Sequence, residues 1–363
     1  MQMKSLLSDS GSIQEDKKIL LNFISYDFLN IAEHPYVKKN AIKYVLKWGS
    51  GASSHPIVSQ QLGCQQALES RLAKLLGKES CIFFQPSQNI HSILLGLLLT
   101  KNSLAFIDQG CASNLYKALP QSTKIIPFAH NDVKHLEKLL IEYKEHTGPK
   151  WIILESLSSQ DGDLIKLKEF IEISNFHSCF VYLEESNTFS ILGHHGLGVG
   201  ALKKDIDCIV GSFQRGSGLH ASFFLSKALL KNYIIESNQE ISSLQLLPPA
   251  TLGSIESYLE LIPDMHSERQ KVAHQSRFLR NELQDMGFCI KKSQAHIILI
   301  QFDNEENFQS FVDHLVEENI LAYIHKQEMM VRLIITMSHD RSIIKEFLDR
   351  MKLWQRPLIY SSL

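Results

Sequence analysis

The feature that most constrains the fold is a series of short apolar runs separated by segments with helical periodicity. Runs of this kind recur through the first two thirds of the chain, at Cys81–Phe84, Leu104–Ile107, Ile125–Phe128, Trp151–Leu154, Phe180–Leu183 and Cys208–Val210. A strand that is apolar throughout must be covered on both faces. The pattern therefore predicts an α/β fold with a mainly parallel central sheet between layers of helices.

Polar residues follow several of these runs at the point where each strand should end. Asp108, Glu155, Glu184 and Ser212 occupy such positions. Each could simply begin a solvent-exposed turn. Because the carboxyl ends of parallel strands meet at one edge of a sheet, where open α/β sheets bind ligands, the four together favour a pocket there.

The pattern changes after about residue 250. A long helical stretch is expected from Ser254 to Met286, ending at Gly287. Strand-like and helical segments then alternate, at Phe288–Ile290, His296–Phe302, Glu305–Glu317, Met330–Thr336 and Ser342–Leu353. We predict an N-terminal segment (1–45), a large α/β domain (46–250) and a smaller C-terminal α+β domain (251–363). In the first part, helices are expected from Pro35 to Gly49, with Val37, Ala41, Val45 and Leu46 on one face, and before Gly77.

Composition excludes several classes of function. The formal net charge is −2, so the chain has no electrostatic signature of nucleic-acid binding. Its six cysteines include no C-x-x-C pair, which argues against a disulfide framework or a zinc site and favours a reducing compartment. The longest apolar run, Ile93–Leu99, is too short to span a bilayer. We expect a cytoplasmic protein without a membrane span, and leave peripheral membrane association open.

A set of motifs in constant order resembles the α-oxoamine synthases. These pyridoxal-phosphate (PLP) enzymes condense an amino acid with an acyl thioester. The matching segments lie between about Asn22 and Met351; they include Gly49-Ser50-Gly51, His130-Asn131-Asp132, Asp161-Gly162-Asp163, Leu183-Glu184-Glu185-Ser186, Leu192–Gly198 and Val331–His339. The resemblance implies a fold-type-I, aminotransferase-like architecture.

One position departs from the family in a way that bears directly on chemistry. Arg215, in Gly211-Ser212-Phe213-Gln214-Arg215, falls where the family pattern G-T-x-S-K has the lysine that forms a Schiff base. A Schiff base requires an amine that can lose its proton, and a guanidinium stays charged at any working pH. The nearby Ser226-Lys227 resembles the missing motif but lies too far along the chain, and we expect it only to begin a helix.

Other cofactor positions of the family are altered as well. Glu184 replaces the aspartate that pairs with the pyridinium nitrogen, Asn187 the neighbouring histidine, and Cys111 the histidine that stacks on the ring. The phosphate-binding segment becomes Gln85-Pro86-Ser87-Gln88, where proline removes a backbone N–H. The resemblance thus implies a degenerate cofactor pocket formed by Arg215, Glu184, Asn187, Cys111, Ser87, Gln88 and Ser212, with Arg332 as a candidate for binding a carboxylate.

Two further candidates have simpler explanations. Cys111 could be a reactive thiol, although cysteine is more commonly a small buried hydrophobe. His194 and His195 are adjacent in a glycine-rich segment and lack a third ligand at suitable spacing. We interpret the histidine pair as part of a structural turn and expect no metal site.

Within the family, the segment Leu183–Gly198 most resembles the non-catalytic long-chain-base 1 subunit of serine palmitoyltransferase. The resemblance implies a silent subunit of a heterodimer, with a lysine-bearing relative as partner and acyl-CoA and amino acid bound at a shared site. PLP would be on that partner or absent, and not covalently held by this chain. The loop of Gly49, Ser50, Gly51, Ser53 and Ser54 would lie at the interface, near the partner's cofactor phosphate. Two alternatives stay open: an enzyme that binds PLP non-covalently with Arg215 as an anion-binding group, and a non-enzymatic homodimer with a binding or regulatory role.

Overall fold

The computed structural model describes residues 12–15, 18–51, 60–85, 90–237 and 246–360. The chain forms two compact units. The large unit comprises His34–Gln160 and Leu164–Met265, and the small unit comprises Met1–Glu33, Asp161–Asp163 and His266–Leu363. These units differ from the ranges expected from sequence, because the N-terminal segment up to Glu33 belongs with the C-terminal part.

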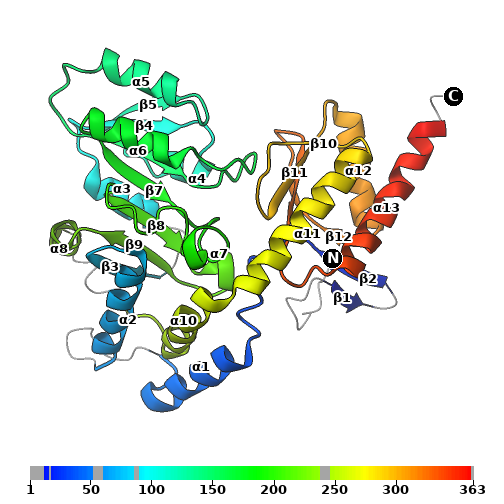
Figure 1. Cartoon of the computed structure of the whole chain (residues 1–363), viewed down its shortest axis with the longest axis horizontal. Helices are drawn as coiled ribbons and strands as arrows, with labels where there is room; N and C mark the ends of the chain where they lie inside the picture. The colour runs from blue at the N-terminus through cyan, green and yellow to red at the C-terminus, as the bar shows by residue number, and fades with distance from the viewer. Residues whose placement is uncertain (1–11, 16–17, 52–59, 86–89, 238–245, 361–363) are drawn as a thin grey trace. The chain divides into compact units, whose positions relative to one another are not determined.

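A seven-stranded sheet forms the centre of the large unit (Figure 1). Its strands lie in the order β3 (Ser80–Phe84), β9 (Ser222–Ser226), β8 (Cys208–Ser212), β7 (Phe180–Glu184), β6 (Lys150–Glu155), β4 (Leu104–Asp108) and β5 (Lys124–Phe128). Only β9 runs antiparallel to its neighbours. Every residue of β3, β4, β8 and β9 is buried, as apolar runs on both faces require. The predicted fold class, a mainly parallel sheet flanked by helices, is confirmed.

Helices pack along this sheet. They are α1 (Pro35–Trp48), α2 (Gln60–Leu76), α3 (Ile90–Leu98), α4 (Ser113–Lys117), α5 (Val133–Glu142), α6 (Leu167–Phe176), α7 (Gln214–Ser217), α8 (Ala228–Ser237) and α10 (Pro249–Leu261). The helices α2 and α8 contact β3, α5 contacts β5, and α6 contacts β7. A buried apolar cluster that includes Leu94, Leu95, Ile107 and Val210 fills the space between sheet and helices.

Helix α1 has the expected bounds and buries Val37 as expected, but its buried face also includes Asn40 and Tyr44 and leaves Leu46 in solvent. Pro35 begins it, and Gly49, with φ of 87°, ends it by donating its N–H to the Val45 carbonyl over 2.8 Å. Leu46, expected on the buried face, is 83 % exposed. Asn40 is buried instead, because its side chain donates to the Gly253 carbonyl of α10 over 2.9 Å.

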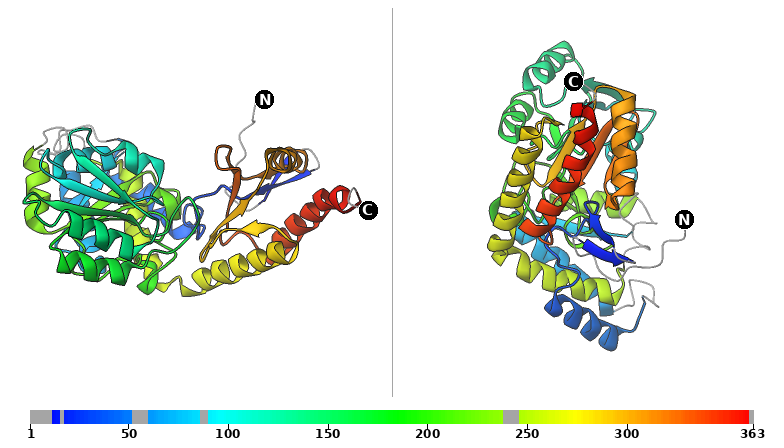
Figure 2. Two further views of the ribbon diagram at one scale, coloured as in Figure 1. Left: turned by 90° about the horizontal axis from the view of Figure 1, so that it is seen from above. Right: turned by 90° about the vertical axis from the view of Figure 1, so that its right-hand side faces the viewer.

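In the small unit, the described residues form two sheets and the helices that pack with them (Figure 2). The N-terminal strands β1 (Ser12–Glu15) and β2 (Lys18–Asn22) pair with β12 (Ile320–Leu321). The antiparallel sheet has the order β10 (Cys289–Ile290), β11 (Ile297–Gln301), β14 (Met330–Ile334) and β13 (Tyr323–His325), and its helices are α11 (His266–Asp285), α12 (Glu305–Glu317) and α13 (Arg341–Tyr360). The parallel pairing of β2 with β12 explains why the N-terminal residues join this unit.

The prediction of a single helix from Ser254 to Met286 was wrong. The structure has α10 and α11, separated by a 3₁₀ turn at Ile262–Asp264. Pro263 lies in that turn, and proline lacks the N–H that a continuous helix would use there. None of the helices in the described residues combines the length and the apolar character needed to cross a membrane.

Candidate functional site

Two glutamates end adjacent strands at the carboxyl edge of the central sheet. Glu155 is the last residue of β6 and Glu184 the last of β7, and the two are register partners. Both side chains are buried. Two acidic groups this close in an apolar sheet are costly to ionise together, so a nearby cation or proton is required.

Arg215 supplies the cation. It lies in α7, directly after β8, where the backbone departs from helical geometry at Arg215 and Gly216. Its Nη1 donates to Asn187 Oδ1 over 2.8 Å, and Asn187 Nδ2 donates to Glu155 Oε1 over 3.0 Å. Gly216 packs closely in this turn, since a Cβ there would approach Ser190 Oγ to 2.1 Å and force that side chain to shift. Arg215, Asn187 and Glu155 thus form one hydrogen-bonded chain across the ends of β6, β7 and β8.

Burial is the main cause of the shifted pKa values of the two glutamates. The pKa of Glu155 is raised to about 8. Burial is the main cause, the Glu184 carboxylate acts in the same direction, and Arg215 opposes both effects. Burial also raises the pKa of Glu184, again opposed by Arg215. Glu184 Oε1 accepts the N–H of Ser186 over 3.0 Å. Its Oε2 is buried and has no hydrogen-bond partner within the described residues.

A histidine that sequence reasoning did not identify lies close to Arg215. His91 of α3 is buried, and its Nδ1 lies 2.7 Å from the Tyr182 hydroxyl of β7. Burial lowers the pKa of His91 to about 3, and the Arg215 charge lowers it as well. His91 is therefore neutral. The sequence offered only its place in an apolar helical run, which does not distinguish it from ordinary core residues.

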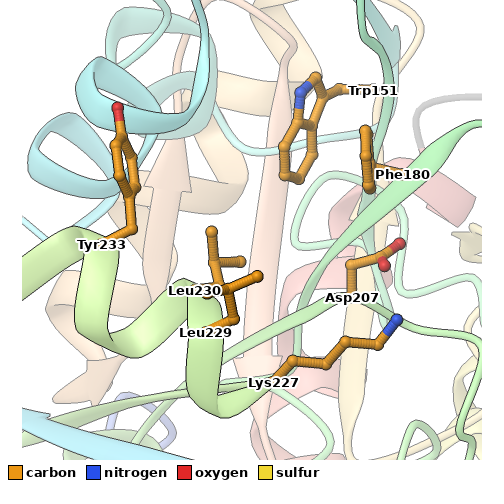
Figure 3. A pocket seen from close by; sticks show the side chains of 7 residues that line it. All are labelled: Trp151, Phe180, Asp207, Lys227, Leu229, Leu230 and Tyr233. Atoms are coloured by element: carbon orange, nitrogen blue, oxygen red, sulfur yellow. The ribbon is translucent and has the colours of Figure 1, made fainter.

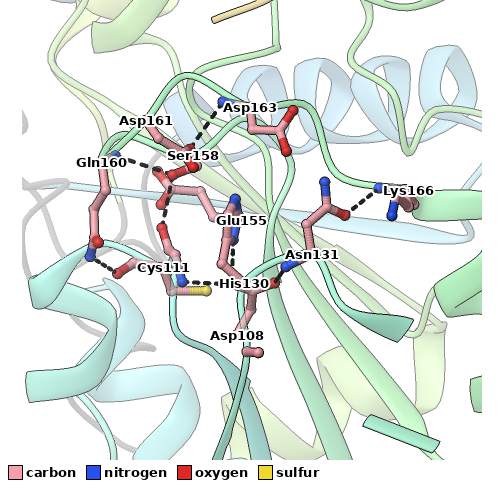
Figure 4. A network of polar contacts seen from close by, with 12 residues as sticks. Asp108, Cys111, His130, Asn131, Glu155, Ser158, Gln160, Asp161, Asp163 and Lys166 are labelled. Carbon is pink, nitrogen blue, oxygen red and sulfur yellow. Dashed lines mark hydrogen bonds and ion pairs between the residues drawn. The ribbon is translucent and has the colours of Figure 1, made fainter. Parts of the chain in front are cut away.

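Cys111 lies beside this cluster, as expected, but not as a reactive thiol. The N–H of the next residue, Ala112, donates to Glu155 Oε2 over 2.9 Å, and Gln160 Nε2 donates to the Cys111 carbonyl over 2.8 Å (Figure 4). The side chain is buried, and burial raises the pKa of the thiol well above its ordinary value. The structure supports the interpretation of Cys111 as a small buried hydrophobe.

Two other strand-end residues hold turns together. Asp108 accepts hydrogen bonds from the N–H groups of Gly110 and Asn131 over 2.6 and 2.8 Å, and it lies 2.6 Å from His130 Nδ1 (Figure 4). Ser212 Oγ accepts the N–H of Gln214 over 3.1 Å. Of the four strand-end groups, Glu155 and Glu184 therefore face Arg215, and the other two stabilise the local backbone.

The remaining candidates do not belong to the cluster around Arg215 as the structure describes it. Ser87, Gln88, Ser53 and Ser54 lie outside the described residues. Gly49, Ser50 and Gly51 are exposed after α1. Arg332 belongs to β14 of the small unit, where its guanidinium lies 4.4 Å from the Tyr323 ring centre and Nη2 donates to the Tyr26 hydroxyl over 3.4 Å.

Lys227 lies at a helix start and the histidine pair in a turn. Lys227 lies between β9 and the first residue of α8, as expected for a lysine at a helix start. His194 and His195 form a 3₁₀ turn, with Gly193 and Gly198 packed so closely that a Cβ at Gly193 would approach the Gly198 carbonyl oxygen to 1.9 Å. In the described part of the chain, no group of three or more potential metal ligands occurs.

The residues present fit PLP in one respect and not in another. A buried carboxylate oxygen without a partner, Glu184 Oε2, suits the protonated ring nitrogen. The position that would supply the amine carries Arg215, whose guanidinium is hydrogen-bonded to Asn187 and cannot form a Schiff base. Position 215 therefore offers no amine for covalent attachment of this cofactor.

Comparison with known proteins agrees with the architecture. The model of the family described as aminotransferase class I and II matches residues 17–351. Proteins named 8-amino-7-oxononanoate synthase from Desulfosudis oleivorans and Bordetella pertussis are 25 % and 27 % identical, covering 96 % and 94 % of this chain and 93 % and 89 % of their own length. A serine palmitoyltransferase structure from Sphingomonas wittichii superposes with a TM-score of 0.88 at 19 % identity, covering 98 % of this chain and 92 % of that one.

The chain belongs to the aminotransferase class I and II family. The predicted resemblance to the α-oxoamine synthases is confirmed by these relatives.

Proposed function

We propose that this member of the aminotransferase class I and II family is the catalytically silent subunit of a serine palmitoyltransferase-like condensing enzyme. The observation that carries the proposal is the chain of hydrogen bonds from Arg215 through Asn187 to Glu155. A permanent cation lies where the family chemistry needs a neutral amine. This chain therefore supplies no nucleophilic nitrogen.

The same arrangement explains how the site can be stable without a cofactor. Glu155 and Glu184 are buried, and in this chain the guanidinium of Arg215 supplies the positive charge that favours their ionised forms. Replacing a bound cationic group by a resident arginine keeps the acidic residues compensated. The residues around Glu155 and Glu184 thus keep their folded arrangement although they do not catalyse a reaction.

The contribution to a partner would come from the exposed backbone after α1. Gly49, Ser50 and Gly51 are small residues, and successive backbone N–H groups of this kind can bind an anion such as a phosphate. The partner would carry the lysine and the covalent PLP, and would condense an amino acid with an acyl-CoA in sphingoid-base synthesis. The names of the structural relatives, which include serine palmitoyltransferase, support this substrate class.

Reconstitution tests the proposal. The chain is purified alone and after co-expression with a lysine-bearing α-oxoamine synthase of the same organism, and each preparation is assayed for release of CoA from acyl-CoA and an amino acid. We expect no turnover by the single chain, a stable pair by native mass spectrometry, and turnover by the pair above that of the relative alone. If no lysine-bearing relative co-purifies with the chain, the result would favour the non-enzymatic homodimer instead.

One observation supports a second candidate, an enzyme that binds PLP non-covalently. Glu184 Oε2 is buried without a partner among the described residues, as a group awaiting a ring nitrogen would be. Titration of the single chain with PLP, followed by borohydride reduction and peptide mapping, separates the candidates. A saturable absorbance without a reduced lysine adduct supports non-covalent binding, and no saturable absorbance supports the silent subunit.

A further inference from the structure

A pocket lies at the edge of the central sheet opposite the glutamates. Its volume is about 510 Å³, and it is lined by Trp151, Phe180, Asp207, Lys227, Leu229, Leu230 and Tyr233 (Figure 3). Trp151 and Phe180 are at the starts of β6 and β7, Asp207 precedes β8, and Lys227 follows the antiparallel β9. All seven residues belong to the large unit. This volume is in the range of small-molecule sites.

Most of the lining is apolar and is supplied by two elements. The Trp151 and Phe180 rings stack with centroids 4.9 Å apart and form one wall, and Leu229, Leu230 and Tyr233 of α8 form the other. Leu229 is 82 % exposed. Apolar surface left in water next to a cavity favours a ligand that covers it.

The polar groups are unevenly distributed. Figure 3 shows Asp207 and Lys227 together on one side of the pocket, away from Tyr233. The Asp207 carboxylate already accepts the Val181 N–H over 2.9 Å and lies in the field of Lys78 and Lys227. The ammonium of Lys227 is exposed and has no hydrogen bond to the described residues. Because Asp207 already has a backbone partner, the Lys227 ammonium is the donor that a ligand can reach at this end of the pocket.

A second unused donor lies in the wall. Trp151 is 5 % exposed, and its Nε1 has no acceptor among the described residues. Buried donors normally have partners. The indole N–H is itself buried within the wall, so the donor that the pocket exposes is the Lys227 ammonium, which is complementary to a ligand that brings acceptors and negative charge.

We propose that this pocket binds a free fatty acid. The hydrocarbon chain lies between the Trp151–Phe180 wall and α8, and the carboxylate pairs with the Lys227 ammonium. An apolar cavity with its polar groups at one end matches a single-chain amphiphile, and a carboxylate can accept hydrogen bonds from the Lys227 ammonium. The site is separate from the Arg215 cluster, so this inference does not depend on the proposed function.

Fluorescence of Trp151 provides a direct test. The chain has three tryptophans, and Trp48→Phe with Trp354→Phe leaves Trp151 as the reporter. A dodecanoate brominated on its chain should quench this fluorescence saturably, whereas an equally brominated dodecylamine should bind at least about tenfold more weakly because it meets the Lys227 charge. Each methylene removed from the fatty acid should weaken binding about fourfold.

Variants test the two ends of the site. Lys227→Ala should weaken dodecanoate binding, whereas Lys168→Ala, which removes an exposed lysine of α6, should not. Leu229→Glu places a negative charge on an exposed wall residue and should abolish binding without unfolding the chain. Calorimetry with the unmodified chain and dodecanoate repeats the measurement if the tryptophan variants are unstable. Equal affinity for the acid and the amine, or no saturable binding by the unmodified chain, would overturn the proposal.

Discussion

Arg215 and Asn187 join two turns that are distant in sequence: Arg215 Nη1 donates to Asn187 Oδ1 over 2.8 Å, and so links the end of β8 to the end of β7. The bond gives the arginine a structural role beside the buried glutamates. Substitutions at position 215 can therefore test the charge of the arginine and the missing amine in separate experiments.

Replacing the arginine by an apolar residue of similar length should destabilise the chain in a pH-dependent way. At pH 5 Glu155 holds its proton, and Arg215→Met should lower the free energy of unfolding by about 1 kcal/mol for the lost hydrogen bond. At pH 8.5 the loss should be larger, because in the unmodified chain the Arg215 charge then stabilises the ionised forms of Glu155 and Glu184. Urea unfolding at both pH values measures this, with the exposed Lys204→Met as control. A loss that does not change with pH would contradict the electrostatic role.

Restoring the family lysine should not restore the chemistry. Arg215→Lys leaves Glu184, Asn187 and the buried Cys111 unchanged, and misplacement of reacting groups by about 1 Å costs about a hundredfold in rate. We expect no CoA release above background from amino acid and acyl-CoA with the single chain, while a lysine-bearing relative assayed in parallel is active. Measurable turnover by this variant without a partner would show that the site is still competent.

Stability should depend on pH through Glu185. Burial raises the pKa of Glu185 to about 8, and the Glu184 charge adds to this effect while the Gly200 N–H opposes it. The folded state therefore binds the proton more tightly than the unfolded chain, so this contribution to stability is present below pH 4.5 and declines as pH rises towards 8. Glu185→Gln should remove the decline, by at most about 1.4 kcal/mol per pH unit. Denaturant unfolding of both proteins at pH 5, 7 and 8 tests it, and parallel pH profiles would refute the assignment.

Bulk in the loop after α1 should impair the proposed pair but not the fold. A Cβ at Gly51 would meet no atom within 4 Å, so Gly51→Trp is compatible with this chain. If the loop lies against a partner's phosphate, the variant should lower the activity of the pair at least about tenfold. Gly96→Trp, at an exposed glycine of α3 that also has open space, is the matched control. Equal activities of the two variant pairs, with sedimentation showing intact assembly, would place the loop away from the shared site.

Much of the architecture follows from local patterns. The apolar runs at 104–107, 151–154 and 180–183 became β4, β6 and β7, because a stretch that is apolar on both faces has few alternatives to a covered strand. Gly49 and Pro35 marked the ends of α1 because their backbone restrictions act locally. The break at Pro263 was missed, although proline carries the signal, since the periodicity on either side looked continuous.

The tertiary structure decided what the local patterns could not. The face that α1 buries is decided by its packing against α10, which is more than two hundred residues away along the chain. Leu46 is exposed as a result. The sequence by itself determined the sheet, the family and the absence of a Schiff-base lysine at position 215, because each of these is a matter of residue type and order. Only the folded chain determined that Arg215 reaches Asn187, that His91 lies in its field, and that the Cys111 thiol is protonated and buried. Hydrogen-bond distance and desolvation depend on which segments meet in space, and those quantities do not exist until the strands are paired.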